Sequence, residues 1–313
     1  MNDQFRNYDN ENVKSSVELT YKNMLTEQSI EKTVFALSSF FETNGLSYNI
    51  WNIINRLDDI VDDSDPDTDL SQIIHCYQTA EAIRRNCIQS NGMLKDIPIR
   101  SIFSDKEWNG IPAKYRLMYN RSLHQLYHHI KTWDWFLLVG FIHDLGKVIL
   151  LPDFGNLPQH FAVGDTFPLG NKLDKNFVFY NKNYHHNNND LNIDIYINHC
   201  GFDNVIFSWG HDEYLAKSLE RNKTKLPREA IYLIRYHSFY SWHTPSNGQI
   251  GYKHLANDYD WYMLPLLKCL QKADLYSKLP NIPDIDSIKY IFDTLIDKYI
   301  PGKKLRLHQC LYI

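Results

Sequence analysis

Cysteine is scarce in this sequence and shows no pairing pattern. The 313 residues include five cysteines, Cys76, Cys87, Cys200, Cys269 and Cys310, which stand far apart without a CxxC pair. An odd and scattered set argues against a disulfide framework and against a zinc site built from thiolates.

A surplus of either charge and a long hydrophobic run are also missing. The chain has 33 Lys and Arg against 37 Asp and Glu, so it lacks the basic footprint of a dedicated nucleic-acid binder. Its longest apolar run, residues 135–142, is too short to span a bilayer. The polar N-terminal stretch MNDQFRNYDNENVKSS fits neither a signal nor a transit peptide. We expect a cytoplasmic monomer with no nucleic-acid or membrane partner.

Strand patterns are scarce, whereas helical periodicity is common. Apolar residues recur at intervals of three and four, which is typical of amphipathic helices. Helices are predicted over residues 16–43, 47–63, 71–86, 132–151, 204–222, 227–243 and 260–279. The segment 132–151 is apolar almost all round and predicts a central buried helix. With 43% hydrophobic residues, the chain can form one all-α domain over residues 1–313.

Two segments interrupt the helical pattern. Residues 90–132 contain glycines and prolines that break any long element, so a long irregular excursion is expected there. Residues 181–190, NKNYHHNNND, are rich in asparagine and predict a surface loop. For His185 and His186 in this loop, a solvated polar role is favoured over a metal site.

The central apolar segment carries a histidine and an aspartate side by side, His143 and Asp144. Buried polar residues are costly unless they are paired or bind a metal. Neighbouring helical positions project about 100° apart, so both side chains can reach an ion that lies between them. The aspartate can then bridge to a second ion. Lys147 follows His143 by four residues and is expected on the same face.

Four more candidates lie in or beside other apolar helical stretches: His75, His211, His237 and Asp274. Taken singly, each histidine is interpreted as a buried side chain with one satisfied hydrogen bond. Taken together with His143 and Asp144, the set predicts a dinuclear site of nitrogen and oxygen ligands. The absence of thiolates favours iron or manganese over a structural zinc.

Two nearby residues are excluded as ligands. Asp212 is followed by Glu213, and both are interpreted as a solvated helix start near Gly210. His243 comes six residues after His237, which places it on a different face of any shared helix.

The motifs of this chain resemble those of the myo-inositol oxygenase family, di-iron enzymes of the wider HD-domain superfamily. Matching segments run in order from FRNY near the N-terminus to LIDKYIPG near the C-terminus, and include DDSDPDTD, HCYQTAEAIR and LLVGFIHDLGKV. HDLGK alone indicates only the superfamily, whereas GDTFPLG, WGHDEY and RYHSFYSWH point to this family. The resemblance implies an HD-domain-like helical bundle around a dinuclear metal site.

The resemblance implies two iron ions, working as a mixed-valent Fe(II)/Fe(III) pair. One iron is assigned to His75, His143, Asp144 and Asp274, and the second to Asp144 as a bridge with His211 and His237. Asp144 and Lys147 are the implied catalytic residues, with Lys147 helping to hold or accept a hydroxyl proton.

The implied substrates are myo-inositol and O₂, and the implied products are D-glucuronate and water. Family contacts to the polyol fall on Arg6, Asp62, Ser64, Lys147, Gly164, Asp165, Ser238 and Lys278. Arg6, in an N-terminal lid or tail at 1–15, and the acidic loop at 62–69 are expected to help exclude water.

The chain departs from the family pattern in three places. Residues from about 88 to 132 are expected to be an external insertion, and residues 181–190 also diverge. His160-Phe161 stands where a tryptophan is expected.

The alternative function is an HD-domain metal-dependent phosphohydrolase, in which a metal-bound hydroxide attacks phosphorus. Asp62 and Asp165 would repel a phosphate, which favours the oxygenase.

Overall fold

The computed structural model describes residue 8 and residues 13–65, 71–276 and 285–311. The predicted all-α class is confirmed. The helices are α1 (Ser15–Glu27), α2 (Ile30–Glu42), α3 (Ile50–Asn55), α4 (Gln72–Cys87), α5 (Asp105–Gly110), α6 (Ala113–Met118), α7 (Leu123–Leu126), α8 (Asp134–Ile142), α9 (His211–Arg221), α10 (Arg228–Tyr236), α11 (Tyr240–His243), α12 (Asp258–Tyr276) and α13 (Ile285–Tyr299).

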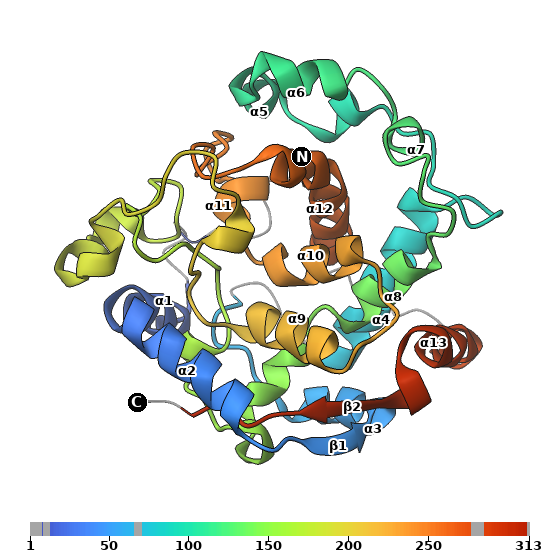
Figure 1. Ribbon diagram of the computed structural model, residues 1–313, viewed down its shortest axis with the longest axis horizontal. Coiled ribbons are helices and arrows are strands. Elements are labelled where there is room, and N and C mark those ends of the chain that lie inside the picture. Colours follow the sequence, from blue (N-terminus) through green and yellow to red (C-terminus); the bar gives the residue numbers. More distant parts are fainter. Residues whose placement is uncertain (1–7, 9–12, 66–70, 277–284, 312–313) are drawn as a thin grey trace.

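Helices α4, α8, α9, α10 and α12 form the centre of the molecule (Figure 1). Helix α4 packs against both α8 and α12, and α10 packs against α9 and α12. Gly140 permits close contact between α8 and α4, because a Cβ there would lie 2.5 Å from Ile83 Cδ1 and 3.2 Å from Ala80 Cα. Within the described residues, no single helix is long and apolar enough to cross a membrane. Only the bent pair Asp134–Leu150 and Pro152–Phe161 reaches that length and composition when taken together.

The predicted helix over 16–43 is two helices. The break falls at Gln28, whose buried side chain donates hydrogen bonds to the carbonyl oxygens of Trp209 (2.8 Å) and His160 (3.1 Å). Ser29 then caps α2 by accepting from the Lys32 amide. Polar side chains that bond to backbone groups compete with a continuous helix. The spacing of apolar residues therefore does not predict the break at Gln28.

A small sheet was not predicted from the sequence. The segment expected as a helix over 47–63 begins as strand β1 (Leu46–Asn49), which pairs antiparallel with β2 (Lys304–Leu307). The helix proper is confined to α3 and a following 3₁₀ helix, Arg56–Asp59. Helix α13 was also missed.

The central apolar segment changes geometry after α8. From Leu145 to Leu150 the chain continues as a 3₁₀ helix that packs against the start of α9. Gly146 is required at this approach, because a Cβ there would lie 1.9 Å from the backbone oxygen of His211.

Residues 88–132, called the arm from here on, are more ordered than the sequence pattern suggests. The arm carries a 3₁₀ helix, Ile99–Ile102, and the short helices α5, α6 and α7. It runs along the outer edge of the bundle, at the top of the view in Figure 1. Its buried side chains, such as Phe103 and Tyr119, belong to the main hydrophobic core, so the arm is packed onto the bundle.

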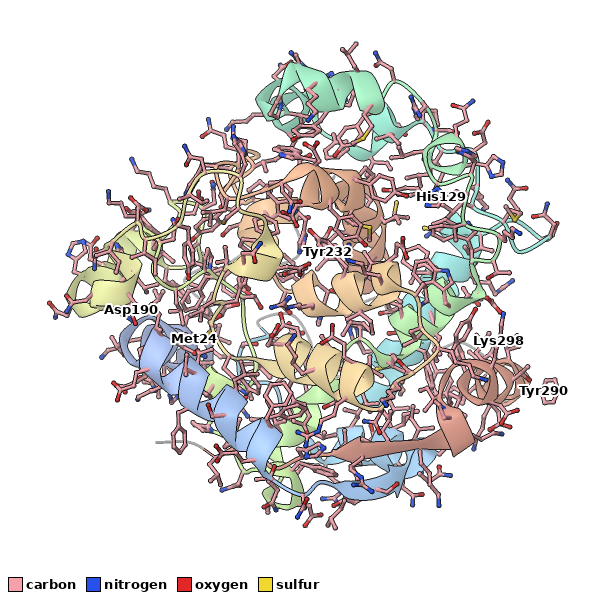
Figure 2. All side chains as sticks on the ribbon, in the orientation of Figure 1. Met24, His129, Asp190, Tyr232, Tyr290 and Lys298 are labelled. Atoms are coloured by element: carbon pink, nitrogen blue, oxygen red, sulfur yellow. The ribbon has the colours of Figure 1, made fainter. Side chains whose placement is uncertain are left out.

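The Asn-rich segment 181–190 lies at the surface, as predicted, but it is anchored there, and His185 is not solvated. His185 is buried and stacks on Tyr180. The side-chain amide of Asn188 donates to the carbonyl oxygens of Leu25 and Gln28 at the end of α1. The Asp190 carboxylate accepts from the backbone amide of Ile30 at 2.7 Å. Asp190 and Met24, labelled in Figure 2, mark this segment and the helix α1 that it contacts. Asparagine side chains supply the backbone partners here, a role that composition does not reveal.

Candidate metal centre

The six predicted ligand residues meet at the centre of the bundle. They are His75 on α4, His143 and Asp144 directly after α8, His211 at the start of α9, His237 directly after α10 and Asp274 on α12. All six are buried, with 1–8% of each residue exposed. Residues far apart in sequence therefore form one cluster of imidazoles and carboxylates.

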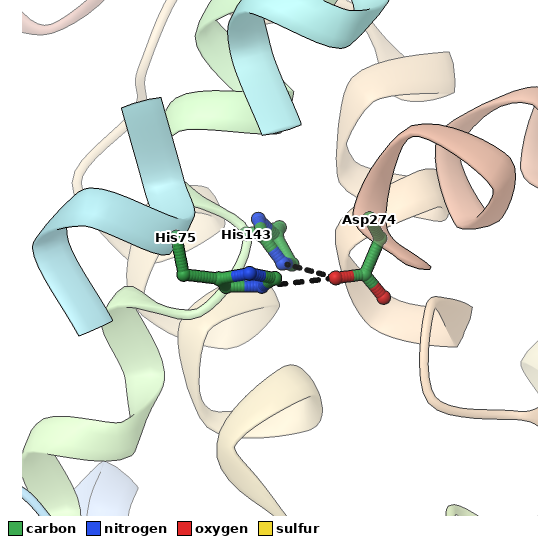
Figure 3. A group of neighbouring side chains, drawn as sticks. All are labelled: His75, His143 and Asp274. Atoms are coloured by element: carbon green, nitrogen blue, oxygen red, sulfur yellow. Dashed lines mark ion pairs between the residues drawn. The ribbon is translucent and has the colours of Figure 1, made fainter. Parts of the chain in front are cut away.

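One group of these side chains surrounds Asp274. Its Oδ1 lies 2.9 Å from His75 Nε2 and 3.6 Å from His143 Nε2, and both contacts are drawn in Figure 3. Asp144 Oδ2 faces the same two nitrogens at 3.5 and 3.6 Å.

A second group surrounds the other oxygen of Asp144. Its Oδ1 lies 3.4 Å from His211 Nε2 and 3.5 Å from His237 Nε2. These two nitrogens are 3.1 Å apart. The Asp144 carboxylate thus turns one oxygen to each group.

These separations suit ligands that share an ion. Metal–ligand bonds of about 2.1 Å place neighbouring ligand atoms about 3.0–3.5 Å apart, and the observed separations are 2.9–3.6 Å. The set offers nitrogen and oxygen only. Within the described residues, Cys76, next to His75, is in no group placed to hold a metal. Burial, and then the charge of Asp144, raises the pKa of its thiol well above the ordinary value.

Three of the imidazoles are oriented by the backbone. His143, His211 and His237 each place Nδ1 2.7–2.9 Å from a backbone carbonyl oxygen. A carbonyl oxygen only accepts, so Nδ1 carries the proton and the lone pair of Nε2 points to the cluster. The residues therefore fit a metal centre, with the ligand atoms prepared for binding.

Lys147 lies over Asp144, whereas the sequence placed it on the face of His143. A 3₁₀ helix aligns residues three apart, and the Lys147 Nζ is 2.9 Å from Asp144 Oδ2. It is also 2.8 Å from Asp62 Oδ2 and 3.1 Å from Gln72 Oε1.

Opposite charges hold these groups ionised in spite of burial. Burial lowers the pKa of Lys147, but Asp144 and Asp62 outweigh it and raise the pKa above its ordinary value. Burial likewise raises the pKa of Asp144, yet Lys147 and then His143 bring it well below the ordinary range. The pKa of Asp62 is also lowered, chiefly by Lys147 acting against burial.

A hollow of about 480 Å³, including its open mouth, adjoins the cluster. The predicted polyol contacts among the described residues all line it: Asp62, Ser64, Lys147, Gly164, Asp165 and Ser238. Arg6 and Lys278 lie outside the described residues.

Sequence reasoning missed several residues that line the hollow. Tyr21 donates to Asp165 Oδ1 at 2.8 Å, and the Tyr8 and Tyr21 hydroxyls are 3.1 Å apart. Tyr240 donates to Asp274 Oδ2 at 3.4 Å. A tyrosine on the apolar stripe of a helix is indistinguishable from a core residue in the sequence, so no signal marked Tyr21.

Asp212 corrects another expectation. It is fully buried rather than solvated, and it accepts from the Thr166 hydroxyl and the Glu213 amide. The start of α9 therefore lies inside the core, whereas the neighbouring charged residues Asp212 and Glu213 had suggested that it is solvated. Within the described part of the chain, neither Asp212 nor His243 belongs to a group placed to hold a metal.

The fold and this cluster define a helical protein with a buried metal centre of histidine and carboxylate ligands. A model of the family described as myo-inositol oxygenase matches residues 14–129 and 121–307. The chain belongs to the myo-inositol oxygenase family, a family of oxygenase enzymes, as its motifs predicted.

Curated relatives match the chain over nearly its whole length. Inositol oxygenase of Danio rerio is 37% identical over 96% of this chain and 92% of its own. The Homo sapiens protein of the same name is 37% identical over 95% and 89%, and that of Dictyostelium discoideum is 36% identical over 96% and 89%. The two segments matched by the family model meet inside the arm.

Proposed function

We propose that this protein cleaves the ring of myo-inositol with O₂, giving D-glucuronate and water, at a centre of two iron ions. The observation that carries the proposal is the Asp144 carboxylate, whose two oxygens face two separate groups of ligand atoms. Such a carboxylate suits a pair of ions better than a single one. Membership of a family named for this oxygenation supports the choice of reaction.

The proposed ligands follow the two groups. His75, His143, Asp144 and Asp274 would hold one iron, and Asp144, His211 and His237 would hold the second. When bound, a mixed-valent iron pair supplies O₂ activation and Lewis acidity toward substrate hydroxyls.

The residues of the hollow suit a polyol. Asp62 and Asp165 accept hydrogen bonds, the Lys147 ammonium donates, and the Ser64 and Ser238 hydroxyls do both. A site that bonds each hydroxyl rejects analogues that lack one. The same carboxylates would repel a phosphate ester, which disfavours the phosphohydrolase alternative.

Lys147 is proposed as a hydrogen-bond donor in the reaction. Because Asp144 and Asp62 raise its pKa, Lys147 stays protonated at neutral pH. Its Nζ then stabilises negative charge that develops on a substrate hydroxyl oxygen. This refines the sequence-based expectation that the lysine helps to hold or accept a hydroxyl proton.

The test is oxygen uptake by protein reconstituted with ferrous iron, with and without myo-inositol, together with an assay for glucuronate. One glucuronate formed for each O₂ consumed supports the proposal. No uptake by iron-loaded protein, together with hydrolysis of a phosphate ester, would replace it with the phosphohydrolase.

Lys147→Met tests the proposed donor. We expect full iron content and a turnover lower by about 10²- to 10³-fold. Lys172→Met is the matched control, since Lys172 is exposed and paired with Asp194. Parental turnover in Lys147→Met would remove this residue from the reaction.

A further inference from the structure

The arm is joined to the interior of the bundle by a buried ion pair. Glu107 on α5 and Lys268 on α12 place Oε1 and Nζ 2.6 Å apart, with 9% and 5% of their side chains exposed. The same Nζ donates to the backbone carbonyl oxygen of His243 at 2.7 Å. Glu107 is itself held, because its Oε2 accepts from the amide and the hydroxyl of Ser104.

The side chain of His243 contacts His237, one of the candidate metal ligands. Its Nε2 lies 2.9 Å from the carbonyl oxygen of His237, and its Nδ1 lies 3.1 Å from the Thr244 hydroxyl. The carbonyl oxygen only accepts, so Nε2 is the protonated nitrogen. His237 directly follows α10, where carbonyl groups have no partner within the helix. The His243 imidazole supplies the missing donor.

We propose that Glu107, Lys268 and His243 are positioning residues for His237, so that the arm helps to shape the metal centre. The inference rests on the proposed role of His237 as an iron ligand. His237 and Ser238 lie in a turn outside any helix, and α11 begins two residues after Ser238. Lys268 holds the end of α11, and His243 holds the turn at the His237 carbonyl.

The buried ion pair allows positioning to be separated from stability. Replacing both partners of such a pair by apolar residues of similar size is often neutral or stabilising, whereas removing one partner is strongly destabilising. The double variant Glu107→Met with Lys268→Met therefore removes the donor to His243 without leaving a buried charge.

The experiment compares this double variant with the parent full-length chain. We measure ferrous iron affinity by competition with a chelator, the thermal unfolding midpoint, and amide hydrogen exchange of metal-free protein over residues 237–244. We expect a modestly lower midpoint, because the His243 carbonyl and the Ser104 amide lose their partners, together with a 10- to 100-fold weaker affinity for one of the two irons and faster exchange at the His243 and Thr244 amides. Parental affinity overturns the inference, and so does parental exchange.

The matched control is Lys114→Met. Lys114 also joins the arm to α12, through Asp258 at 2.7 Å, but this pair is exposed and lies apart from His243. We expect parental affinity and exchange. An equal loss in this control would overturn the inference, because any contact of the arm would then have the same effect.

Substitution of His243 tests the last step without touching the ion pair. His243→Gln keeps an N–H donor and is expected to retain iron affinity, whereas His243→Ala is expected to weaken it as the double variant does. Equal affinities in the two variants would overturn the positioning role. A parent that takes up no iron would refute the proposed function, and unchanged exchange in the double variant would refute the positioning chain separately.

Discussion

The two groups of ligands that meet at Asp144 are built in different ways. In the first group, His75 and Asp274 belong to the first turn of α4 and the last turn of α12, two long helices that pack along each other, and His143 follows α8. His211 and His237 stand at helix ends, one as the first residue of α9 and the other directly after α10. A ligand inside a helix is positioned by the packing of the whole helix. A ligand at a helix end depends on a few local contacts, which single substitutions can remove.

The largest expected effect comes from removing the residue common to both groups. Asp144→Ala should abolish iron binding and turnover, because each group loses an oxygen ligand and the buried Lys147 loses its nearest partner among the ligands. His211→Ala should lose about half of the iron and all turnover. Iron per chain and oxygen uptake measure both variants. Full iron occupancy in Asp144→Ala would contradict its role as a bridge.

A pair of glycine substitutions sharpens the comparison. Gly146→Ala places a Cβ 1.9 Å from the backbone oxygen of His211, so α9 must move. We expect a loss of more than about 4 kcal/mol in the free energy of unfolding and loss of iron from the second group.

Gly140→Ala is the counterpart at the packed helices. Its nearest neighbour would be the flexible end of Ile83 at 2.5 Å, so we expect a cost of about 1–3 kcal/mol with both irons retained. Urea unfolding and iron analysis distinguish the two variants. Equal iron loss would contradict the view that helix ends are the vulnerable positions.

Buried carboxylates elsewhere in the molecule differ from those beside Lys147 in the direction of their pKa shifts. Lys147 keeps the pKa of Asp144 and Asp62 low, whereas burial, with Asp203 adding to it, raises the pKa of Asp260 to about 6. A raised pKa means that folded protein binds the proton more tightly. The contribution of Asp260 to stability is therefore full below pH 3.8 and is lost as the pH rises to about 6.

Asp260→Asn should remove that pH dependence. The unfolding free energy of the variant relative to the parent should increase by up to about 3 kcal/mol between pH 4 and pH 7. Urea unfolding of both proteins at the two pH values measures the difference. A constant difference would show that Asp260 titrates normally.

The smallest expected effect on iron content comes from substituting Asp212, the neighbour of His211 in the sequence. Asp212→Ala should leave the iron content unchanged, because Asp212 bonds to Thr166 and the Glu213 amide and faces neither ligand group. We expect a loss of about 1–3 kcal/mol in stability from the unsatisfied partners. Iron loss as large as in His211→Ala would make Asp212 part of the centre.

Much of the candidate site was predictable from the sequence alone. Motifs such as HDLGK and WGHDEY identify the family and locate the clustered histidines and aspartates, because the residue types that bind metals recur in short, local patterns. The all-α class was predictable for a similar reason, since apolar periodicity reflects one buried face of each helix.

The tertiary structure decided what depends on partners far along the chain. It turned the two oxygens of Asp144 to different groups, moved Lys147 over Asp144 through a 3₁₀ helix, and buried Asp212. It also paired Glu107 with Lys268, 161 residues away. Periodicity records only whether a side chain faces the core, and not which distant backbone or charge it meets there. For that reason the residues that cluster in the candidate metal centre could be named in advance, whereas the contacts that orient them could not.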